Sequence, residues 1–173
     1  MNFFVYNYLM RSIGFLVMGV SGSGKTSLGV ALAYKLGWEF LDADDFHPPE
    51  NIGKMADGIP LDDSDRAPWL ASLHDQLLTS LKADRHPVLA CSALKESYRA
   101  QLLDKIDGIA VIYLKGSYDL ILSRISAREG HYMKSDMLKS QFDILEEPQS
   151  AFEVDVSKSL DEMVESILQT YAV

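Results

Sequence analysis

The segment Gly19-Val20-Ser21-Gly22-Ser23-Gly24-Lys25-Thr26 carries the pattern G-x-x-x-x-G-K-[ST] between an apolar run and a helix-like stretch, the context that makes it a phosphate-binding loop. Its glycines let backbone N–H groups and the next helix N-terminus face phosphate oxygens. Lys25 then reaches the terminal phosphates, and the Thr26 hydroxyl can bind Mg²⁺. We therefore assign the whole segment, together with Ser27, to nucleotide binding.

Apolar runs and helical patterns alternate on both sides of this loop. Five short apolar runs predict strands, at 13–18, 39–41, 87–90, 110–114 and 152–156. Helical patterns lie near 25–36, 67–82, 96–104, 117–128, 136–145 and 159–171. Because these helices are long enough for crossover connections, we predict a three-layer α/β fold with a five-stranded parallel sheet covered on both faces.

The chain length and the lack of repeats or linkers predict a single domain. We place it at residues 12–173, after an N-terminal tail at 1–11. The tail is apolar, but it lacks the charged start of a signal peptide and Arg11 interrupts it. Two segments do not fit simple crossovers, at about 42–66 and 124–134, and inserts of this kind over strand ends often carry function.

Composition limits the possible partners. With 25 acidic and 16 basic residues, the formal charge is −9, so we expect no nucleic-acid partner. No apolar run reaches the roughly 18 residues of a membrane span, so we expect no membrane partner either. The single cysteine, Cys91, lies in an apolar run and predicts a buried thiol in a reducing, cytoplasmic setting.

Acidic residues follow the second predicted strand rather than the third. The third strand ends in Cys91-Ser92-Ala93, without the aspartate that holds Mg²⁺ in many phosphate-loop ATPases. After the second strand, Asp42 and Asp44 fall on the same side if the chain stays extended. There Asp42 could hold a magnesium ion, and Asp44 could accept a proton from an attacking hydroxyl. Solvated turn residues are the alternative interpretation.

Several further blocks agree in order and spacing with one family. They are DADDFHPPENIGKMADGIPLDDSDRAPWL (42–70), CSALKESYR (91–99), IYLKG (112–116), RISAREGHYMKSDML (124–138) and QFDILEEP (141–148). Together with the phosphate loop they closely resemble gluconokinase over about residues 14–170. The resemblance implies ATP-dependent phosphorylation of D-gluconate to 6-phosphogluconate on a nucleoside-monophosphate-kinase-like fold, often as a homodimer. DADDFH stands where many relatives have DGDxxH, which puts only the role of Asp45 in doubt.

The resemblance also implies residue roles around the acceptor. Asp44 would face the gluconate hydroxyl, and His47, Lys54, Arg66 and Arg99 would surround the sugar acid. The residue types suit a polyhydroxy carboxylate, because carboxylates accept hydroxyl protons and guanidinium groups bind carboxylates in a fork. Each has a plainer alternative: Arg66 could pair with the acidic residues beside it, and His47 could be a turn residue.

The second insert resembles a kinase lid. Arg124 and Arg128 lie four residues apart, on one face if the segment is helical. In this interpretation Arg124 stacks on adenine, Arg128 closes on the transferring phosphate as a catalytic residue, and His131 contacts the substrate. The alternative is an exposed basic helix end.

Two rival functions are open from the sequence. One is another small-metabolite kinase, acting on shikimate or a nucleotide, and the other is a nucleotide-binding module without catalysis. An Asn-Lys-x-Asp guanine-reading motif is absent from the sequence, and paired carboxylates have no purpose in a mere binder. We therefore expect an enzyme that uses ATP and Mg²⁺. Trp38 and the stripe Leu73/Leu77/Leu81 are predicted core residues, and Trp69 is unassigned.

Overall fold

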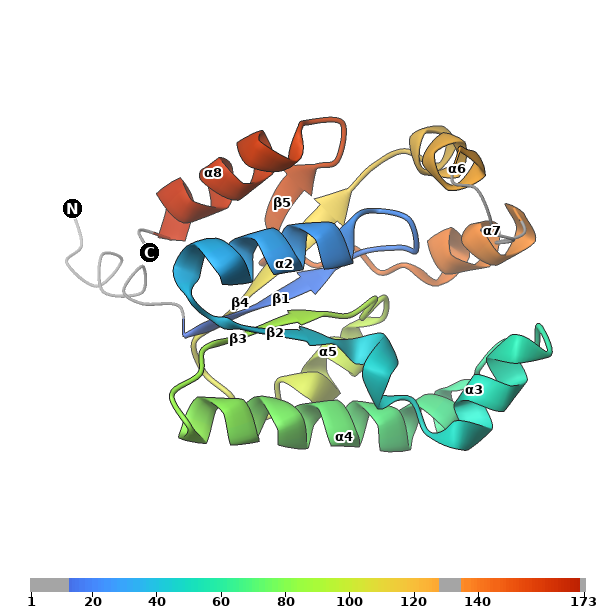
Figure 1. Ribbon diagram of the computed structural model, residues 1–173. Coiled ribbons are helices and arrows are strands. Elements are labelled where there is room, and N and C mark those ends of the chain that lie inside the picture. Colours follow the sequence, from blue (N-terminus) through green and yellow to red (C-terminus); the bar gives the residue numbers. More distant parts are fainter. Residues whose placement is uncertain (1–12, 128–134, 172–173) are drawn as a thin grey trace.

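A computed structural model describes residues 13–127 and 135–171, arranged around a five-stranded sheet of order β2-β3-β1-β4-β5 (Figure 1). The strands are β1 (Gly14–Met18), β2 (Glu39–Asp42), β3 (Pro87–Ala90), β4 (Ile109–Lys115) and β5 (Phe152–Asp155). The helices are α2 (Lys25–Leu36), the 3₁₀ helix η1 (Ala43–Phe46), α3 (Pro49–Ala56), α4 (Asp63–Lys82), α5 (Glu96–Leu102), α6 (Tyr118–Ser126), α7 (Ser135–Ile144) and α8 (Leu160–Tyr171). All four strand pairs are parallel, as predicted.

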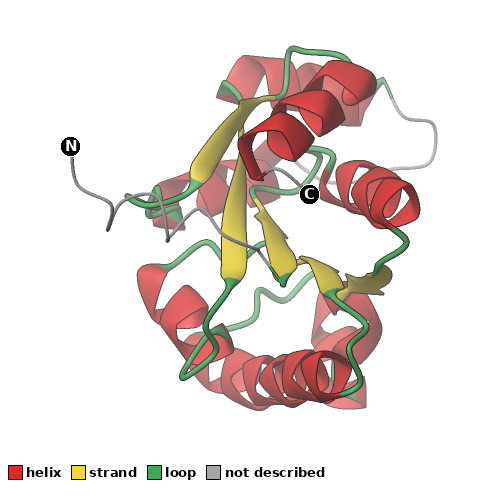
Figure 2. Cartoon of the chain, turned by 90° about the vertical axis from the view of Figure 1, so that its left-hand side faces the viewer, coloured by secondary structure: helices red, strands yellow, loops and turns green. Residues whose placement is uncertain are grey.

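The central strand β1 packs against helices on both faces of the sheet. Successive side chains of a strand point to opposite faces, and all five residues of β1 are buried. Phe15 and Val17 join the core under α2 and α8, whereas Leu16 and Met18 join the core over α4 and α5. Figure 2 shows the sheet between these two layers of helices, which confirms the three-layer prediction.

The carboxyl ends of the strands meet at one edge of the sheet, where the segments after β1, β2 and β3 come together. At this edge α6 and α7 pack on the phosphate loop through a third apolar cluster, which includes Val20, Leu94, Ile121, Ile125 and Leu138. Helix α3 projects from the same end on the other side (Figure 1). The fold therefore gathers distant segments around the loop at 19–24.

Helix limits follow local capping. Helix α2 has the predicted bounds, and Gly37 ends it with a φ of 66° that favours glycine. Helix α4 begins at Asp63, four residues before the predicted start. Its first turn is fixed by a capping box in which Asp62 accepts the Asp65 N–H and Asp65 accepts the Asp62 N–H.

The segment 42–66 contains η1 and α3, neither of which the sequence predicted. Helix α3 shows no clear inward apolar stripe because its apolar side chains face solvent, with Ile52 53% and Met55 41% exposed. Its buried residue is polar: the Asn51 amide donates to the Asp65 carbonyl at 2.9 Å. A hydrogen bond to the start of α4 thus holds a helix that has little core of its own.

Two further predictions meet the structure here. The Cys91 thiol is buried, as predicted, and burial raises its pKa to about 12. Among the helices at 13–127 and 135–171, none combines the length and the apolar character needed to cross a bilayer. The tail at 1–11 lies outside the described residues.

Candidate active site

The loop between β1 and α2 forms a tight turn that favours glycine at several points, Gly22 and Gly24 among them. Gly24 has a φ of 99° directly before α2. Gly22 has a φ of 79°, and a Cβ atom there would lie 2.5 Å from Cγ1 of Ile125 in α6. Both positions favour glycine on backbone grounds, and the second also allows α6 to approach the loop. The loop therefore ends directly at the N-terminus of α2, so its backbone N–H groups and those of the first helical turn lie close together. Such an arrangement suits the binding of phosphates.

Lys25 lies folded back over this loop. Its Nζ donates to the carbonyl oxygen of Val20 at 3.0 Å. Burial lowers the pKa of the Lys25 ammonium group, and the nearby carboxylates of Asp42 and Asp44 act in the opposite direction. A phosphate chain in the loop would bring negative charge to this buried cation, which favours its charged form.

The carboxylates after β2 reach the loop through a 3₁₀ turn, not through an extended strand. The chain turns into η1 directly after Asp42, so the extended alternation considered for Asp42 and Asp44 does not occur. Instead, Asp42 Oδ1 accepts the Asp44 N–H at 3.1 Å, and Asp42 Oδ2 accepts the Thr26 hydroxyl at 3.0 Å. The turn places the Asp42 carboxylate against Thr26 in the first turn of α2, and it leaves the Asp44 side chain 89% exposed.

The Thr26 hydroxyl and the Asp42 carboxylate offer neighbouring oxygen atoms, the ligand type that Mg²⁺ prefers. Within the described residues, no group of three or more His, Cys, Asp or Glu side chains could hold a metal ion. A magnesium ion that also binds phosphates and water needs only one or two protein ligands. The pair therefore fits such an ion.

His47 lies behind Asp44. Its Nε2 is 3.9 Å from Oδ1 of Asp44, and its side chain is only 6% exposed. Burial lowers the pKa of His47, the Arg66 charge lowers it further, and Asp44 opposes both. Its buried Nδ1 has no hydrogen-bond partner among the described residues. A neutral imidazole therefore presents Nε2 toward the carboxylate.

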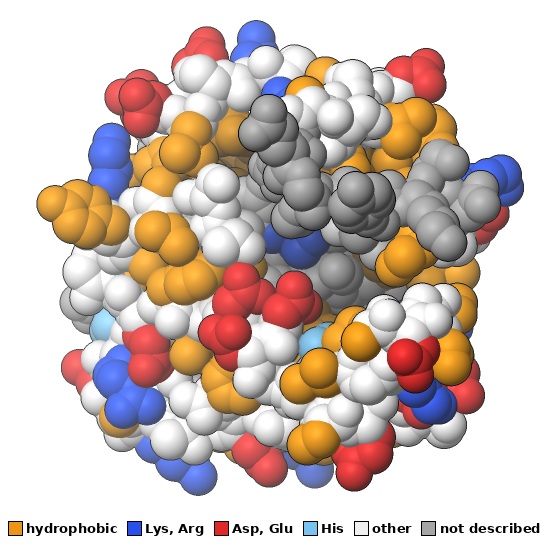
Figure 3. Space-filling model, turned by 45° about the vertical axis from the view of Figure 1, so that its right-hand side comes forward, with side chains coloured by type: hydrophobic (Ala, Val, Ile, Leu, Met, Phe, Trp, Pro, Cys, Tyr) orange, Lys and Arg blue, Asp and Glu red, His pale blue; other side chains and the backbone are white. Residues whose placement is uncertain are grey.

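A cavity of about 280 Å³ connects the phosphate loop with the segment 42–66. Its lining includes Ser21 and Lys25 from the loop, Asp44, His47 and Arg66 from the predicted acceptor residues, Tyr98 from α5, and Met137, Ser140 and Gln141 from α7. The space-filling view shows basic side-chain atoms inside a hollow and a group of acidic side chains on its rim (Figure 3). Cationic and anionic side chains therefore line the same cavity.

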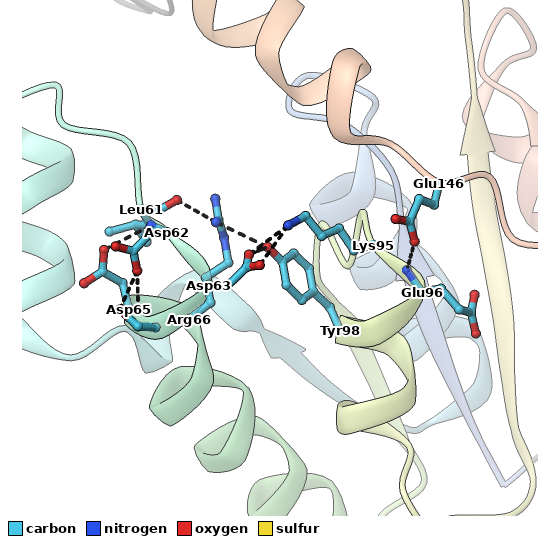
Figure 4. Close-up of polar contacts among 10 residues, drawn as sticks. Leu61, Asp62, Asp63, Asp65, Arg66, Lys95, Glu96, Tyr98 and Glu146 are labelled. Carbon is cyan, nitrogen blue, oxygen red and sulfur yellow. Dashed lines mark hydrogen bonds and ion pairs between the residues drawn. The ribbon is translucent and has the colours of Figure 1, made fainter.

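Arg66 and Tyr98 form one wall of this cavity (Figure 4). Nη1 of Arg66 donates to the Leu61 carbonyl at 2.6 Å and to the Tyr98 hydroxyl at 3.4 Å. The Tyr98 hydroxyl donates to Asp63, which also pairs with Lys95 at 2.9 Å. Burial and then Asp63 raise the pKa of Tyr98, which therefore stays protonated. The contacts hold Nη1 and leave Nε and Nη2 of Arg66 without a hydrogen bond to the described protein.

Arg99 does not line the cavity, contrary to its predicted place around the acceptor. Its side chain is 5% exposed. Nη1 donates to the Ala93 and Leu94 carbonyls, and Nη2 donates to the Glu146 carbonyl and the Glu96 carboxylate. These bonds occupy the guanidinium group, so Arg99 joins helix α5 to the backbone at 93–94 and at 146 and is not available to a ligand.

Lys54 also lies away from the cavity lining. Its Nζ is 2.6 Å from Oδ1 of Asp65, and that hydrogen bond is the main reason why the pKa of Lys54 is raised. Arg124 lies in the last turn of α6. Hydrogen bonds from Ser157 are the main cause of the lowered pKa of Asp155, and the Arg124 charge acts in the same direction. Arg128 and His131 lie outside the described residues.

The lining also includes residues that the sequence did not point to, among them Trp69, Tyr98 and Gln141. Each lies inside a block that carries the family resemblance, but selection by residue type favoured charged groups. Because these side chains are uncharged, their roles can be recognised only from their contacts in the structure. Trp69 packs on His47, Tyr98 supports Arg66, and the Gln141 side chain accepts the Ser21 N–H at 2.6 Å.

Comparison with known proteins adds to this geometry. Residues 21–172 match the family model for shikimate kinase. The probable gluconokinase of Mus musculus is 47% identical over 174 residues, covering 89% of this chain and 95% of the relative. The thermoresistant gluconokinase of Escherichia coli K12 is 42% identical over 159 residues, covering 90% and 91%. A crystal structure of a gluconokinase from Sinorhizobium meliloti superposes with a TM-score of 0.83 at 45% identity, covering 94% and 93%.

Proposed function

Because the chain belongs to the gluconokinase family and carries a shikimate kinase-family domain, we propose that it transfers the γ-phosphate of ATP to D-gluconate, giving 6-phospho-D-gluconate. One observation carries the proposal. A single cavity is lined by the loop residues Ser21 and Lys25, by the Asp44 carboxylate and by the Arg66 guanidinium group. A phosphate site, a proton acceptor and an anion receptor therefore share a space suited to a small metabolite.

The loop residues Gly19–Thr26 and Ser27 would hold the phosphates of ATP. Backbone N–H groups supply fixed partial positive charge, and Lys25 supplies a full charge near the terminal phosphate. Phosphoryl transfer needs little covalent help from a protein, because positioning and charge stabilisation account for most of the catalysis. Lys25 would leave the Val20 carbonyl for a phosphate oxygen, which is the stronger acceptor.

Thr26 and Asp42 would hold the magnesium ion, Asp42 directly or through a bound water. A bound Mg²⁺ would supply positive charge beside the phosphates and so reduce the negative charge that the acceptor meets. The 3.0 Å contact between the two side chains supports this assignment, since it keeps both oxygens beside the first turn of α2.

Asp44 would act as the general base. Its carboxylate accepts the proton of the gluconate 6-hydroxyl while that oxygen attacks the γ-phosphorus, and the bond to the ADP oxygen breaks in line. His47, neutral and turned toward Asp44, would donate to the carboxylate or to a sugar hydroxyl. Asp44 lies in the first turn of η1 with its carboxylate 3.9 Å from Nε2 of His47, so the two side chains lie side by side.

Arg66 would bind the gluconate carboxylate with Nε and Nη2. The Leu61 carbonyl and the Tyr98 hydroxyl fix the other edge of its guanidinium plane. A fixed plane favours a two-pronged ion pair with a carboxylate. Lys54 and Arg99 are not part of this proposal, because their charged groups are bound within the protein.

The lid roles come from the family resemblance. Arg128 would act on the transferring phosphate, Arg124 would contact adenine, and His131 would contact gluconate. Arg128→Ala should therefore lower kcat more than ADP affinity, and Arg124→Ala should do the reverse. Equal losses of ADP affinity in the two variants would contradict this division.

A cytoplasmic location and a homodimer are further parts of the proposal.

A coupled assay of ADP release tests the function. Purified protein with ATP and Mg²⁺ is given gluconate, shikimate, glucose and nucleoside monophosphates in turn. We expect turnover with gluconate and little with the others. Preference for shikimate or a nucleotide would favour the rival kinase activities, and no turnover with any acceptor would favour a binding module. The family relatives named gluconokinase favour the first outcome.

A further inference from the structure

Helix α7 contacts the phosphate loop through one polar side chain. The backbone N–H of Ser21 donates to Oε1 of Gln141 at 2.6 Å, across 120 residues of sequence. A backbone N–H can only donate, so the oxygen of the Gln141 amide must face the loop. The contact lies at the wall of the cavity, since both residues line it.

Lys25 holds the other side of the same peptide unit. The Val20 carbonyl accepts from Lys25, and the Ser21 N–H that follows it donates to Gln141. The C=O and N–H of a trans peptide point in opposite directions. Both polar groups of this peptide therefore have hydrogen-bond partners within the protein. The two donors that we expect to bind a terminal phosphate, the Lys25 ammonium group and the Ser21 N–H, are thus already occupied.

Apolar packing fixes the place of Gln141 on α7. Leu138 and Phe142, three residues before it and one after it, pack in the cluster that includes Val20 of the loop. Leu138 and Phe142 are four residues apart and share one helix face, and Gln141, three residues after Leu138, lies beside that face. Gln141 is thus held on the face turned to the loop, while Met137 and Ser140 of the same helix line the cavity.

We infer that Gln141 is a positioning residue that stands in for the terminal phosphate of ATP at the Ser21 N–H. In the structure its amide oxygen satisfies that donor. A γ-phosphate oxygen carries charge and accepts more strongly than an amide oxygen, so ATP displaces Gln141, whereas ADP leaves it in place. The contact thereby distinguishes nucleotides with and without the γ-phosphate. The inference rests on the proposed use of ATP.

Two variants of Gln141 separate this role from a merely structural one. Gln141→Met keeps the length of the side chain but offers no comparable acceptor, so a γ-phosphate meets no competitor. The affinity for a non-hydrolysable ATP analogue should rise about three- to tenfold, the range for one hydrogen bond, with little change for ADP. Gln141→Glu keeps an acceptor and adds a negative charge. It should weaken the ATP analogue about tenfold or more, and ADP much less.

The measured quantity is the ratio of the two dissociation constants, obtained by calorimetry without acceptor. Asp143→Asn is the matched control, because Asp143 lies on the same helix with its side chain 61% exposed and pairs with Lys139. It should keep the wild-type ratio. The inference is overturned if the Met and Glu variants change the ratio in the same direction, or if neither changes it. Failure of the wild-type protein to bind either nucleotide would overturn the proposed function itself.

Discussion

The imidazole of His47 lies flat on the indole of Trp69, with ring centroids 4.3 Å apart and planes 9° apart. Trp69 is itself fixed, because its Nε1 donates to the Ala43 carbonyl at 2.8 Å. The indole therefore joins helix α4 both to the turn that carries Asp44 and to the ring beside it. Stacking on an apolar surface also explains why burial is the largest cause of the lowered pKa of His47.

The lowered pKa of His47 predicts how stability depends on pH. In the unfolded chain His47 titrates near 6.5, and in the folded protein it titrates lower. As the pH falls below about 6.5, the unfolded state binds more protons, so the free energy of unfolding decreases. We expect the melting temperature to fall from about pH 7.5 to about pH 5.5, and to fall less in His47→Gln. Equal falls in both proteins would remove His47 as a cause.

Asp44→Asn should fold and bind ATP but lose most turnover. An amide cannot accept the hydroxyl proton, and a lost general base lowers kcat by roughly 10²–10⁴-fold. Steady-state kinetics with gluconate measure the loss, and nucleotide titration checks binding. Asp45→Asn is the matched control on the adjacent residue, which does not line the cavity, and it should stay near wild type. An Asp44→Asn enzyme within twofold of wild-type kcat would remove Asp44 from the mechanism.

Arg66→Ala should raise the KM for gluconate strongly and leave the KM for ATP nearly unchanged. Lys at this position should rescue only partly, because an ammonium group cannot form the two-pronged contact. Glucose should be a poor acceptor for the wild-type enzyme, since it leaves the guanidinium group without a carboxylate. An unchanged gluconate KM in the alanine variant, or similar rates with glucose and gluconate, would contradict the role.

Arg99→Ala should affect folding rather than acceptor binding. The variant leaves the Ala93, Leu94 and Glu146 carbonyls without their shared donor. Removing one partner of a buried polar network costs about 3 kcal/mol or more, so we expect a clearly lower melting temperature. The gluconate KM of the protein that remains folded should match wild type. A raised KM at unchanged stability would return Arg99 to the acceptor site.

The sheet and the phosphate loop were predictable because their signals are local. Strand β3 begins and ends at the predicted residues, and α2 does so as well. The signal was weaker where a contact between distant residues decides the conformation. Helix α3 depends on the bond from Asn51 to Asp65. The early start of α4, by contrast, follows a local signal, the capping box of Asp62 and Asp65, which the apolar pattern of the helix does not include.

The site residues show the same division. Charge and hydroxyl chemistry suggested Lys25, Thr26 and Asp42, and the structure brings these three together. The same reasoning could not distinguish Arg66 from Arg99, because both are guanidinium groups in family blocks. Only the packing of Arg99 among backbone carbonyls separates them.

Strand β3 lies between β1 and β2, so it separates the segments that follow these two strands at the edge of the sheet that carries the site. Neighbouring strands lie about 4.8 Å apart, so the phosphate loop after β1 and the turn after β2 start about 9.5 Å apart. Small residues follow β3, and Ser92 and Ala93 form part of the cavity wall. An aspartate in their place would add a further negative charge between the proposed phosphate site and Asp44. The missing carboxylate after β3 thus leaves a neutral gap in which two anionic reactants can approach each other.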